Sequence, residues 1–321
     1  MLSTNGEGKK SGPVRGRSLW SYAAQRFMRN KKGMVCLAII LILYGAGIFA
    51  PLVAPFDYDQ QNLGNTLQSP GWEHPFGTDR LGRDVFSRII YGIRTTVIVT
   101  VAAMSAGGLL LGIALGLISG YFGRLVDSII MRIGEVFLAF PDILLVILIT
   151  ATLKPRVTAW FQGFEDTIGV EGLVRSGFVD YLVVFGALAI VSWVGMARVV
   201  RGQALSLKES QYVTAARALG ASHLRIILRH ILPNILPQII VMVSVGMGSI
   251  AGSEVILSWL GLGVQPPVPS LGVMIFDNGD ISILRTTPYL LLFPVVTVAI
   301  IIFAFNLLGD ALNDALNPKS R

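Results

Sequence analysis

The 321-residue sequence is strongly apolar and carries an excess of basic residues. Hydrophobic residues make up 53% of the chain and charged residues only 14%, the formal net charge is +7, and the mean hydropathy is +0.67. This composition excludes an ordinary soluble domain and favours residence in a lipid bilayer. The single cysteine, Cys36, excludes a disulfide framework and a cysteine-based zinc site.

The chain begins with a polar and basic segment, residues 1–32. Apolar residues recur at helical spacing from Leu19 to Phe27, beside Arg26 and Arg29. This pattern is typical of a short helix that lies on the surface of a membrane. We therefore expect a cytoplasmic basic tail with a short interfacial helix, and a segment that anchors the chain only by its charges is the alternative.

Runs without charged residues predict the membrane-spanning helices. A helix needs on the order of 20 apolar residues to cross about 30 Å of hydrocarbon. Five runs of about this length lack Asp, Glu, Lys, Arg and His: residues 33–56, 95–123, 181–197, 231–253 and 286–309. A sixth apolar run, residues 129–153, contains Arg132, Glu135 and Asp142. The sequence therefore predicts an all-α polytopic membrane protein with six transmembrane helices.

These runs divide the chain into four parts. They are the basic tail 1–32, the first transmembrane helix with an extracytoplasmic amphipathic segment at 33–93, a core of five transmembrane helices at 94–310, and a cytoplasmic tail at 311–321. Within the core, residues 154–180 mix aromatic and charged side chains on the outer side. We expect them to form a connector, and a lid or a docking surface for an extracellular partner is the alternative.

The amphipathic segment precedes the second span. Val85, Phe86, Ile89 and Ile90 share one face of a helical run, and Arg83, Ser87 and Arg88 do not. We expect residues 84–90 to lie along the outer membrane surface.

The distribution of charge predicts the orientation. Most of the 26 Lys and Arg residues fall within 1–32, 124–132, 198–229 and 319–321, whereas Asp and Glu are frequent within 57–84 and 165–180. The positive-inside rule places both termini and residues 198–229 in the cytoplasm. Because the basic residues border apolar spans and lack interleaved aromatic residues, anionic lipid and an intracellular protein are better partners than nucleic acid.

Four glycines recur at four-residue spacing in the second span: Gly108, Gly112, Gly116 and Gly120. Such a series lets two helix backbones approach closely in lipid and pack by dispersion contacts. We expect a neighbouring helix to occupy this groove, and chance enrichment in a glycine-rich protein is the alternative.

Residues 206–233 predict a compact helix, turn and helix on the cytoplasmic side. Ser206 and Glu209 have capping-box spacing at the start of the first helix. Gly220 can adopt the left-handed conformation that ends a helix, Ser222 can cap the second helix, and Pro233 is expected to stop it. This arrangement indicates a docking element.

Three acids fall within or beside the apolar runs, namely Glu254, Glu135 and Asp142. One or more of them could face a translocation path and meet the amino terminus of a peptide. The alternative is that they lie near the ends of spans or pair within the bundle.

Several catalytic motifs are missing from the sequence. It contains no G-x-x-x-x-G-K-[ST] phosphate loop, no H-E-x-x-H pair and no G-x-S-x-G elbow. We therefore expect no catalytic residue, no metal site and no cofactor in this chain. A stand-alone secondary transporter or channel, and a purely structural scaffold, are alternative functions.

Three motifs carry a resemblance to a known family. Residues 212–220 with residues 230–233 resemble the EAA loop of ATP-binding-cassette (ABC) importer permeases, although Thr214 replaces the motif glutamate and His230 an apolar residue. Residues 76–88, and residues 257–267 with 269–272, resemble the peptide, opine and nickel subgroup, in particular its dipeptide and oligopeptide C-type subunits.

The resemblance implies a function and a set of partners. It implies the six-helix fold of type I ABC importer permeases in the bacterial plasma membrane, where the EAA loop, residues 206–233, couples the subunit to ATPases. The implied partners are a homologous second permease, two cytoplasmic ATPase subunits that bind ATP and Mg²⁺, and an extracytoplasmic substrate-binding protein. The implied coupling residues are Tyr212, Thr214, Ala215, Ala216, Arg217, Leu219, Gly220, Ala221, Arg225, Leu232 and Pro233.

Overall fold

The computed structural model describes residues 19–169, 172–174 and 176–316. The predicted tail segments 1–18 and 317–321 lie outside these residues. All regular elements of the described residues are helices, and six helices are long and apolar enough to cross a membrane. They are Lys31–Ile48, Val85–Phe122, Asp142–Ile168, Phe178–Leu207, His223–Trp259 and Tyr289–Leu316. The predicted all-α fold with six membrane helices is confirmed.

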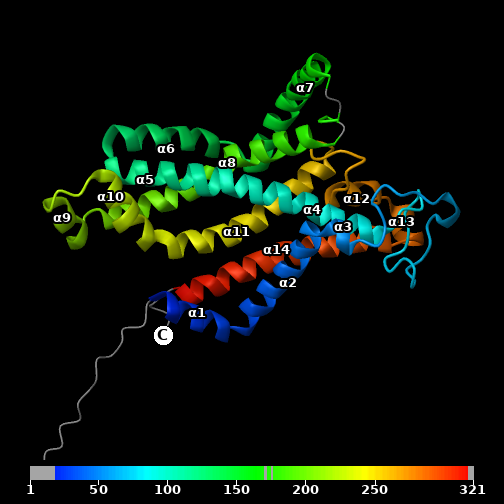
Figure 1. The fold of residues 1–321 in the computed structure, drawn as a ribbon, viewed down its shortest axis with the longest axis horizontal. Helices are drawn as coiled ribbons and strands as arrows, with labels where there is room; N and C mark the ends of the chain where they lie inside the picture. The colour runs from blue at the N-terminus through cyan, green and yellow to red at the C-terminus, as the bar shows by residue number, and fades with distance from the viewer. Residues whose placement is uncertain (1–18, 170–171, 175, 317–321) are drawn as a thin grey trace, which may run out of the picture.

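The first membrane helix, α2 (Lys31–Ile48), lies between α1 (Leu19–Arg29) and the short α3 (Ala50–Val53). Asn30 starts α2, because its side chain accepts a hydrogen bond from the Gly33 N–H at 3.1 Å. The chain leaves the helix at Phe49, since Pro51 lacks the N–H that would continue the hydrogen-bond ladder. Helix α1 packs against the last helix, α14 (Tyr289–Leu316), as Figure 1 shows.

The second span is one continuous helix with a π-helical centre. It consists of α4 (Val85–Ala103), the π-helix η2 (Met104–Gly112) and α5 (Ile113–Phe122). The helix starts earlier than predicted because Asp84 caps it, accepting a hydrogen bond from the Ser87 N–H at 2.7 Å. The prediction that residues 84–90 lie along the outer membrane surface was wrong. Val85 and Ile89 are buried in a cluster with residues of other helices, and Ile90 is buried as well.

The predicted span at residues 129–153 is two helices, α6 (Arg124–Leu138) and α7 (Asp142–Ile168). Pro141 separates them, because it lacks an N–H and disfavours a helical conformation at the residue before it. Helix α6 lies beside α5 and α8 (Phe178–Leu207), whereas α7 turns away from the bundle (Figure 1). The prediction of a connector at 154–180 was also wrong for its first part. Helix α7 continues to Ile168, so the residues from 154 to 168 are helical.

Two predicted boundaries near the docking element were wrong. Ser206 lies on α8, which continues to Leu207. The next helix, α9 (Gln211–Ala218), starts at Ser210 without a capping box. Pro233 does not end a helix: α10 (His223–Ile226), the π-helix η3 (Ile227–Ile231) and α11 (Leu232–Trp259) are continuous. Pro233 lies directly after the π-helix η3, at the point where the hydrogen-bond pattern of the helix changes.

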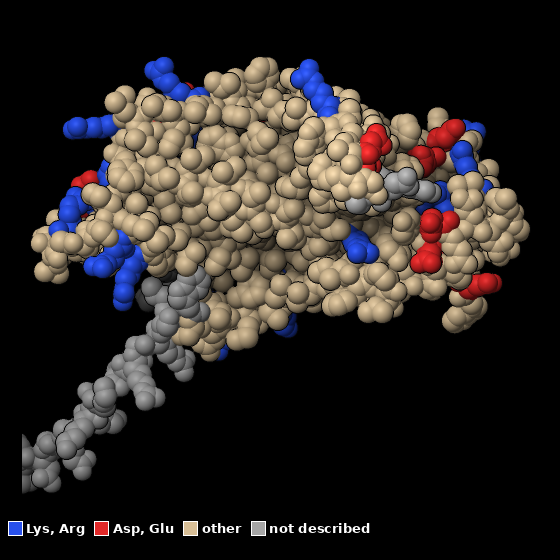
Figure 2. Space-filling view, turned by 45° about the horizontal axis from the view of Figure 1, so that its top comes forward, with Lys and Arg blue, Asp and Glu red and all other residues tan. Residues whose placement is uncertain are grey.

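The two ends of the bundle differ in charge. Figure 2 shows Lys and Arg side chains gathered around α9 and α10, and Asp and Glu side chains gathered at the opposite end. The opposite end holds residues 57–84, α12 (Leu271–Asp277) and α13 (Ile281–Thr286). We call the end with α9 and α10 the basic end, and the end with residues 57–84, α12 and α13 the acidic end.

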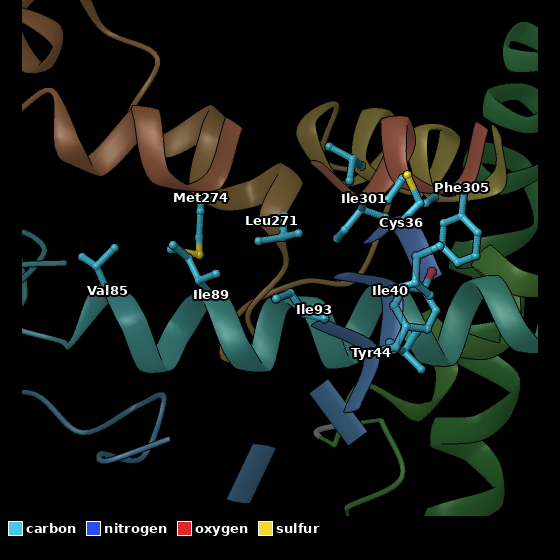
Figure 3. Close-up of a cluster of buried hydrophobic side chains, with 14 of the residues drawn as sticks. Cys36, Ile40, Tyr44, Val85, Ile89, Ile93, Leu271, Met274, Ile301 and Phe305 are labelled. Atoms are coloured by element: carbon cyan, nitrogen blue, oxygen red, sulfur yellow. The ribbon is translucent and has the colours of Figure 1, made fainter. Parts of the chain in front are cut away.

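A hydrophobic core joins the first, second and last spans. Ile40 and Tyr44 of α2, Ile93 of α4, and Ile301 and Phe305 of α14 belong to one buried cluster (Figure 3). Leu271 and Met274 of α12 extend this cluster toward the acidic end, where they meet α4. The core therefore ties the amino-terminal helix to the helices that surround the sites described next.

Candidate functional site

The docking element at the basic end is a helix, a tight turn and a second helix. We call α9, its turn and α10 the coupling module, residues 210–226. Gly220 adopts the left-handed conformation with φ of 79°, and the Ala221 N–H donates to the Ala216 carbonyl at 3.0 Å. Ser222 caps α10 by accepting from the Arg225 N–H at 3.4 Å. The turn therefore has the geometry that the glycine and the serine predicted.

One face of the module is anchored in the bundle. Val213 and Ile226 of the module are fully buried, in a cluster with Ile231 of η3 and residues of α5 and α8. Tyr121 of α5 also forms a hydrogen bond with His223 Nδ1 at 2.8 Å. The module is thus packed against the ends of α5, α8 and α11.

The other face of the module is open. Leu219 is 88% exposed, Tyr212 42% and Leu224 66%, although such apolar side chains gain free energy when they are covered. The other predicted coupling residues are exposed or half-buried: Thr214, Ala215, Ala216, Arg217, Gly220, Ala221, Arg225, Leu232 and Pro233. The Thr214 hydroxyl, at the position of the motif glutamate, donates to the Ser210 carbonyl at 3.1 Å.

An ion pair that the sequence analysis missed fastens α6 beside the module. Asp127 accepts a hydrogen bond from Arg201 Nη2 at 2.6 Å and pairs with Arg201 Nε, and the Ser119 hydroxyl donates to it at 2.5 Å. The hydrogen bond from Arg201 holds the pKa of Asp127 below its ordinary 3.8. An acid within the basic segment 124–132 was the available signal, but its partner is 74 residues away in sequence.

A central cavity of about 430 Å³ lies among η2, α7, α8 and α11. Its wall is mostly apolar, with three serine hydroxyls and one ionisable side chain, Asp142. The serines are Ser192, Ser249 and Ser253, and the methionines of the wall are Met104, Met196 and Met242. Methionine is flexible and polarisable, so such a wall can adapt to solutes of different shape.

The structure separates the three predicted acids. Asp142 lines the cavity, whereas Glu135 is exposed on α6 and lies outside the cavity wall. Glu254 is fully buried and also lies outside the wall. Its carboxyl group accepts hydrogen bonds from the hydroxyls of Thr96 at 2.8 Å, Ser258 at 2.9 Å and Ser270 at 3.3 Å. Glu254 thus joins α4, α11 and the start of α12.

Three of the four predicted glycines contact α8. A Cβ atom at Gly112, Gly116 or Gly120 would lie 2.7 Å from atoms of α8. Gly108 does not contact α8. Gly107 faces α8 instead, and a Cβ atom at Gly107 would lie 2.4 Å from the Ala189 carbonyl oxygen. The π-helix explains the difference, because its wider turn brings the residue five positions before Gly112 to the same face.

Two family descriptions match the sequence. Residues 112–321 match the family described as binding-protein-dependent transport system inner membrane component. Residues 18–70 match the N-terminal transmembrane domain of oligopeptide transport permease C.

Characterised relatives are similar over nearly the whole chain. The dipeptide transport system permease protein DppC of Alkalihalophilus pseudofirmus is 39% identical, over 95% of this chain and 91% of that protein. The oligopeptide transport system permease protein OppC of Bacillus subtilis has the same identity and coverage. The glutathione transport system permease protein GsiD of Shigella dysenteriae is 37% identical, over 96% and 93%. The chain therefore belongs to the family of binding-protein-dependent transport system inner membrane components, the permease subunits of ABC importers.

Proposed function

We propose that this chain is one of two homologous permease subunits in a bacterial importer of dipeptides and oligopeptides. The names of the similar permeases, for dipeptides, oligopeptides and glutathione, support a peptide substrate. The subunit spans the plasma membrane with both termini and the coupling module in the cytoplasm. The charge difference between the two ends supports this orientation, because basic residues are retained on the inner side.

The observation that carries the proposal is the coupling module, which is anchored on one face and open on the other. The open face, with Leu219 and Tyr212, docks on an ATPase subunit. Two such subunits bind ATP and Mg²⁺, so this chain needs no nucleotide site of its own. Closure of the ATPases moves the module, and the buried Val213 and Ile226 transmit the movement to α5, α8 and α11.

The central cavity is this subunit's half of the translocation path, and the second permease supplies the other half. Its apolar, methionine-containing wall accepts different peptide side chains, and Asp142 attracts the ammonium group that every unblocked peptide carries. A substrate-binding protein delivers the peptide at the acidic end. Glu254 and Glu135 have no contact with the solute in this arrangement.

Uptake by the complete complex of two permeases, two ATPase subunits and the substrate-binding protein in proteoliposomes tests the proposal. We expect uptake of a dipeptide to require ATP and to persist when an ionophore collapses the membrane potential. Gly220→Pro should uncouple ATP hydrolysis from uptake, because proline cannot adopt the φ of 79° found at Gly220. Gly202→Ala, at an exposed helical glycine with no atom near its Cβ position, is the control.

Two results would contradict the proposal. Wild-type uptake by the Gly220→Pro complex would exclude coupling through this turn. Uptake that ignores ATP and disappears with the membrane potential would indicate a stand-alone secondary transporter.

A further inference from the structure

The wall of the central cavity contains one side chain held in a slot between two glycines. Met104, the first residue of η2, is only 5% exposed. A Cβ atom at Gly108 would lie 2.5 Å from the Met104 sulfur, and one at Gly246 of α11 would lie 2.5 Å from its methyl carbon. The Met104 side chain therefore fills the space that a side chain at either glycine would need.

This slot also explains Gly108, which has no contact with α8. Met104, Gly108 and Gly246 all line the cavity. Met104 also belongs to the buried apolar cluster with Val99, Ala103 and Leu257, none of which lines the cavity. The side chain thus lies on the border between a packed cluster and an open space.

The packing around Met104 leaves it one direction in which to move. Protein cores are too densely packed to accept a displaced side chain, so a methionine that leaves the slot must turn into the cavity. Methionine has three rotatable bonds and makes such a movement at small cost. Displacement from the slot would therefore reduce the free space of the cavity without disturbing the surrounding helices.

We propose that Met104 determines the size of the peptide side chains that the path accepts. The absence of side chains at Gly108 and Gly246 lets Met104 stay in the slot, outside the free space of the cavity. The inference rests on the proposed role of the cavity as part of the path. Met104 changes the free space of the cavity but not the charge of its wall. It should therefore discriminate between bulky and small peptides that carry the same charge.

The test compares uptake of dialanine and diphenylalanine by the reconstituted complex. Gly246→Ala and Gly108→Ala should each lower the ratio of diphenylalanine to dialanine uptake by about tenfold, the usual effect of a methyl-sized misfit in a binding pocket. Gly186→Ala is the control, because Gly186 is a glycine of α8 outside the cavity wall and no atom lies within 4 Å of its Cβ position.

A rescue experiment separates a displaced Met104 from general damage. Adding Met104→Ala to Gly246→Ala should return the ratio to the wild-type value or above it. A ratio for Gly246→Ala equal to that of Gly186→Ala would overturn the inference, as would a deficit that persists in the double variant. If one glycine variant fails to assemble, the other provides the same comparison.

A filling substitution separates this inference from the proposed path. Gly195 lines the cavity, so Gly195→Trp should block uptake of both peptides while the complex still assembles and hydrolyses ATP. If Gly195→Trp blocks uptake but the ratio in the alanine variants is unchanged, only the role of Met104 is wrong. If uptake of both peptides continues, the cavity does not lie on the path, and the proposed path fails with it.

Discussion

At the acidic end one group of charged side chains is buried and paired, whereas at the basic end the coupling module presents most of its side chains to solvent. Asp79 accepts hydrogen bonds from Arg88 at 2.5 Å and from Arg83 at 2.8 Å, and His74 pairs with Asp84 at 2.9 Å. In α9, by contrast, Val213 is the one buried residue.

The difference indicates how each end is stabilised. The acidic end pairs the charges of Asp79, Arg83 and Arg88 within the chain. The module leaves Leu219 and Tyr212 uncovered, and under the proposed function an ATPase subunit covers its open face. Substitutions at the acidic end should therefore change stability, and those on the open face should change coupling.

The largest expected loss of stability is at Asp79. Asp79→Ala leaves Arg88, which is 6% exposed, without its carboxylate partner. An uncompensated buried charge costs about 4 kcal/mol. Thermal unfolding in detergent should show a clearly lower Tm than for Asp59→Ala, an exposed acid of the same segment. Equal Tm values would contradict the assignment of the ion pair.

The pH dependence of the acidic end follows from the same carboxylate. Burial alone would raise the pKa of Asp79, but the Arg88 charge and hydrogen bonds from the Arg83 and Leu81 backbone outweigh it, so the pKa lies below the ordinary 3.8. A lowered pKa stabilises the fold above the unfolded pKa, and this contribution is lost as the pH falls below about 4. The Asp79→Ala variant should therefore lose less stability than the wild type when the pH falls below about 4.

A smaller loss is expected at Glu254. Glu254→Ala leaves the hydroxyls of Thr96, Ser258 and Ser270 without their acceptor, at a cost of about 3 kcal/mol. Glu254→Gln keeps an acceptor oxygen and should cost about 1 kcal/mol. Because Glu254 does not line the cavity, the glutamine variant should transport peptides as the wild type does. A changed peptide preference in that variant would restore Glu254 to the path.

The smallest change in stability is expected on the open face. Leu219→Ser should shift the free energy of unfolding by less than about 0.5 kcal/mol, because Leu219 is 88% exposed. The same substitution should weaken co-purification of the ATPase subunits. Val213→Ser, at the buried position of the same helix, should lower the free energy of unfolding and leave co-purification of the ATPase subunits unchanged. Loss of stability in the Leu219 variant would show that the open face packs within the chain.

The sequence predicted the spans well because the absence of charge over membrane length is a strong signal. It predicted the turn at Gly220 because few residues adopt a left-handed conformation. Proline was a weaker guide: Pro141 separates two helices, whereas Pro155, Pro237 and Pro294 lie inside helices. Only the surrounding packing distinguishes these cases.

Side-chain positions were harder to predict than helices. The π-helix η2 replaces Gly108 by Gly107 on the face toward α8, and apolar sequence gives no sign of a π-helical turn. Asp142 and Glu254 look alike in sequence, yet one lines the cavity and the other lies among three hydroxyls. Asp127 and Arg201 meet only in the folded chain.

The most direct test of the account is a cross-link from Leu219→Cys in membranes that contain the whole complex. The native Cys36 is buried and can be replaced by serine to give a single reactive thiol. We predict that a thiol-specific cross-linker joins position 219 to an ATPase subunit and that a membrane-impermeant reagent reaches it only in inside-out vesicles. Labelling from the outside of intact cells, with no cross-link to an ATPase subunit, would contradict the account.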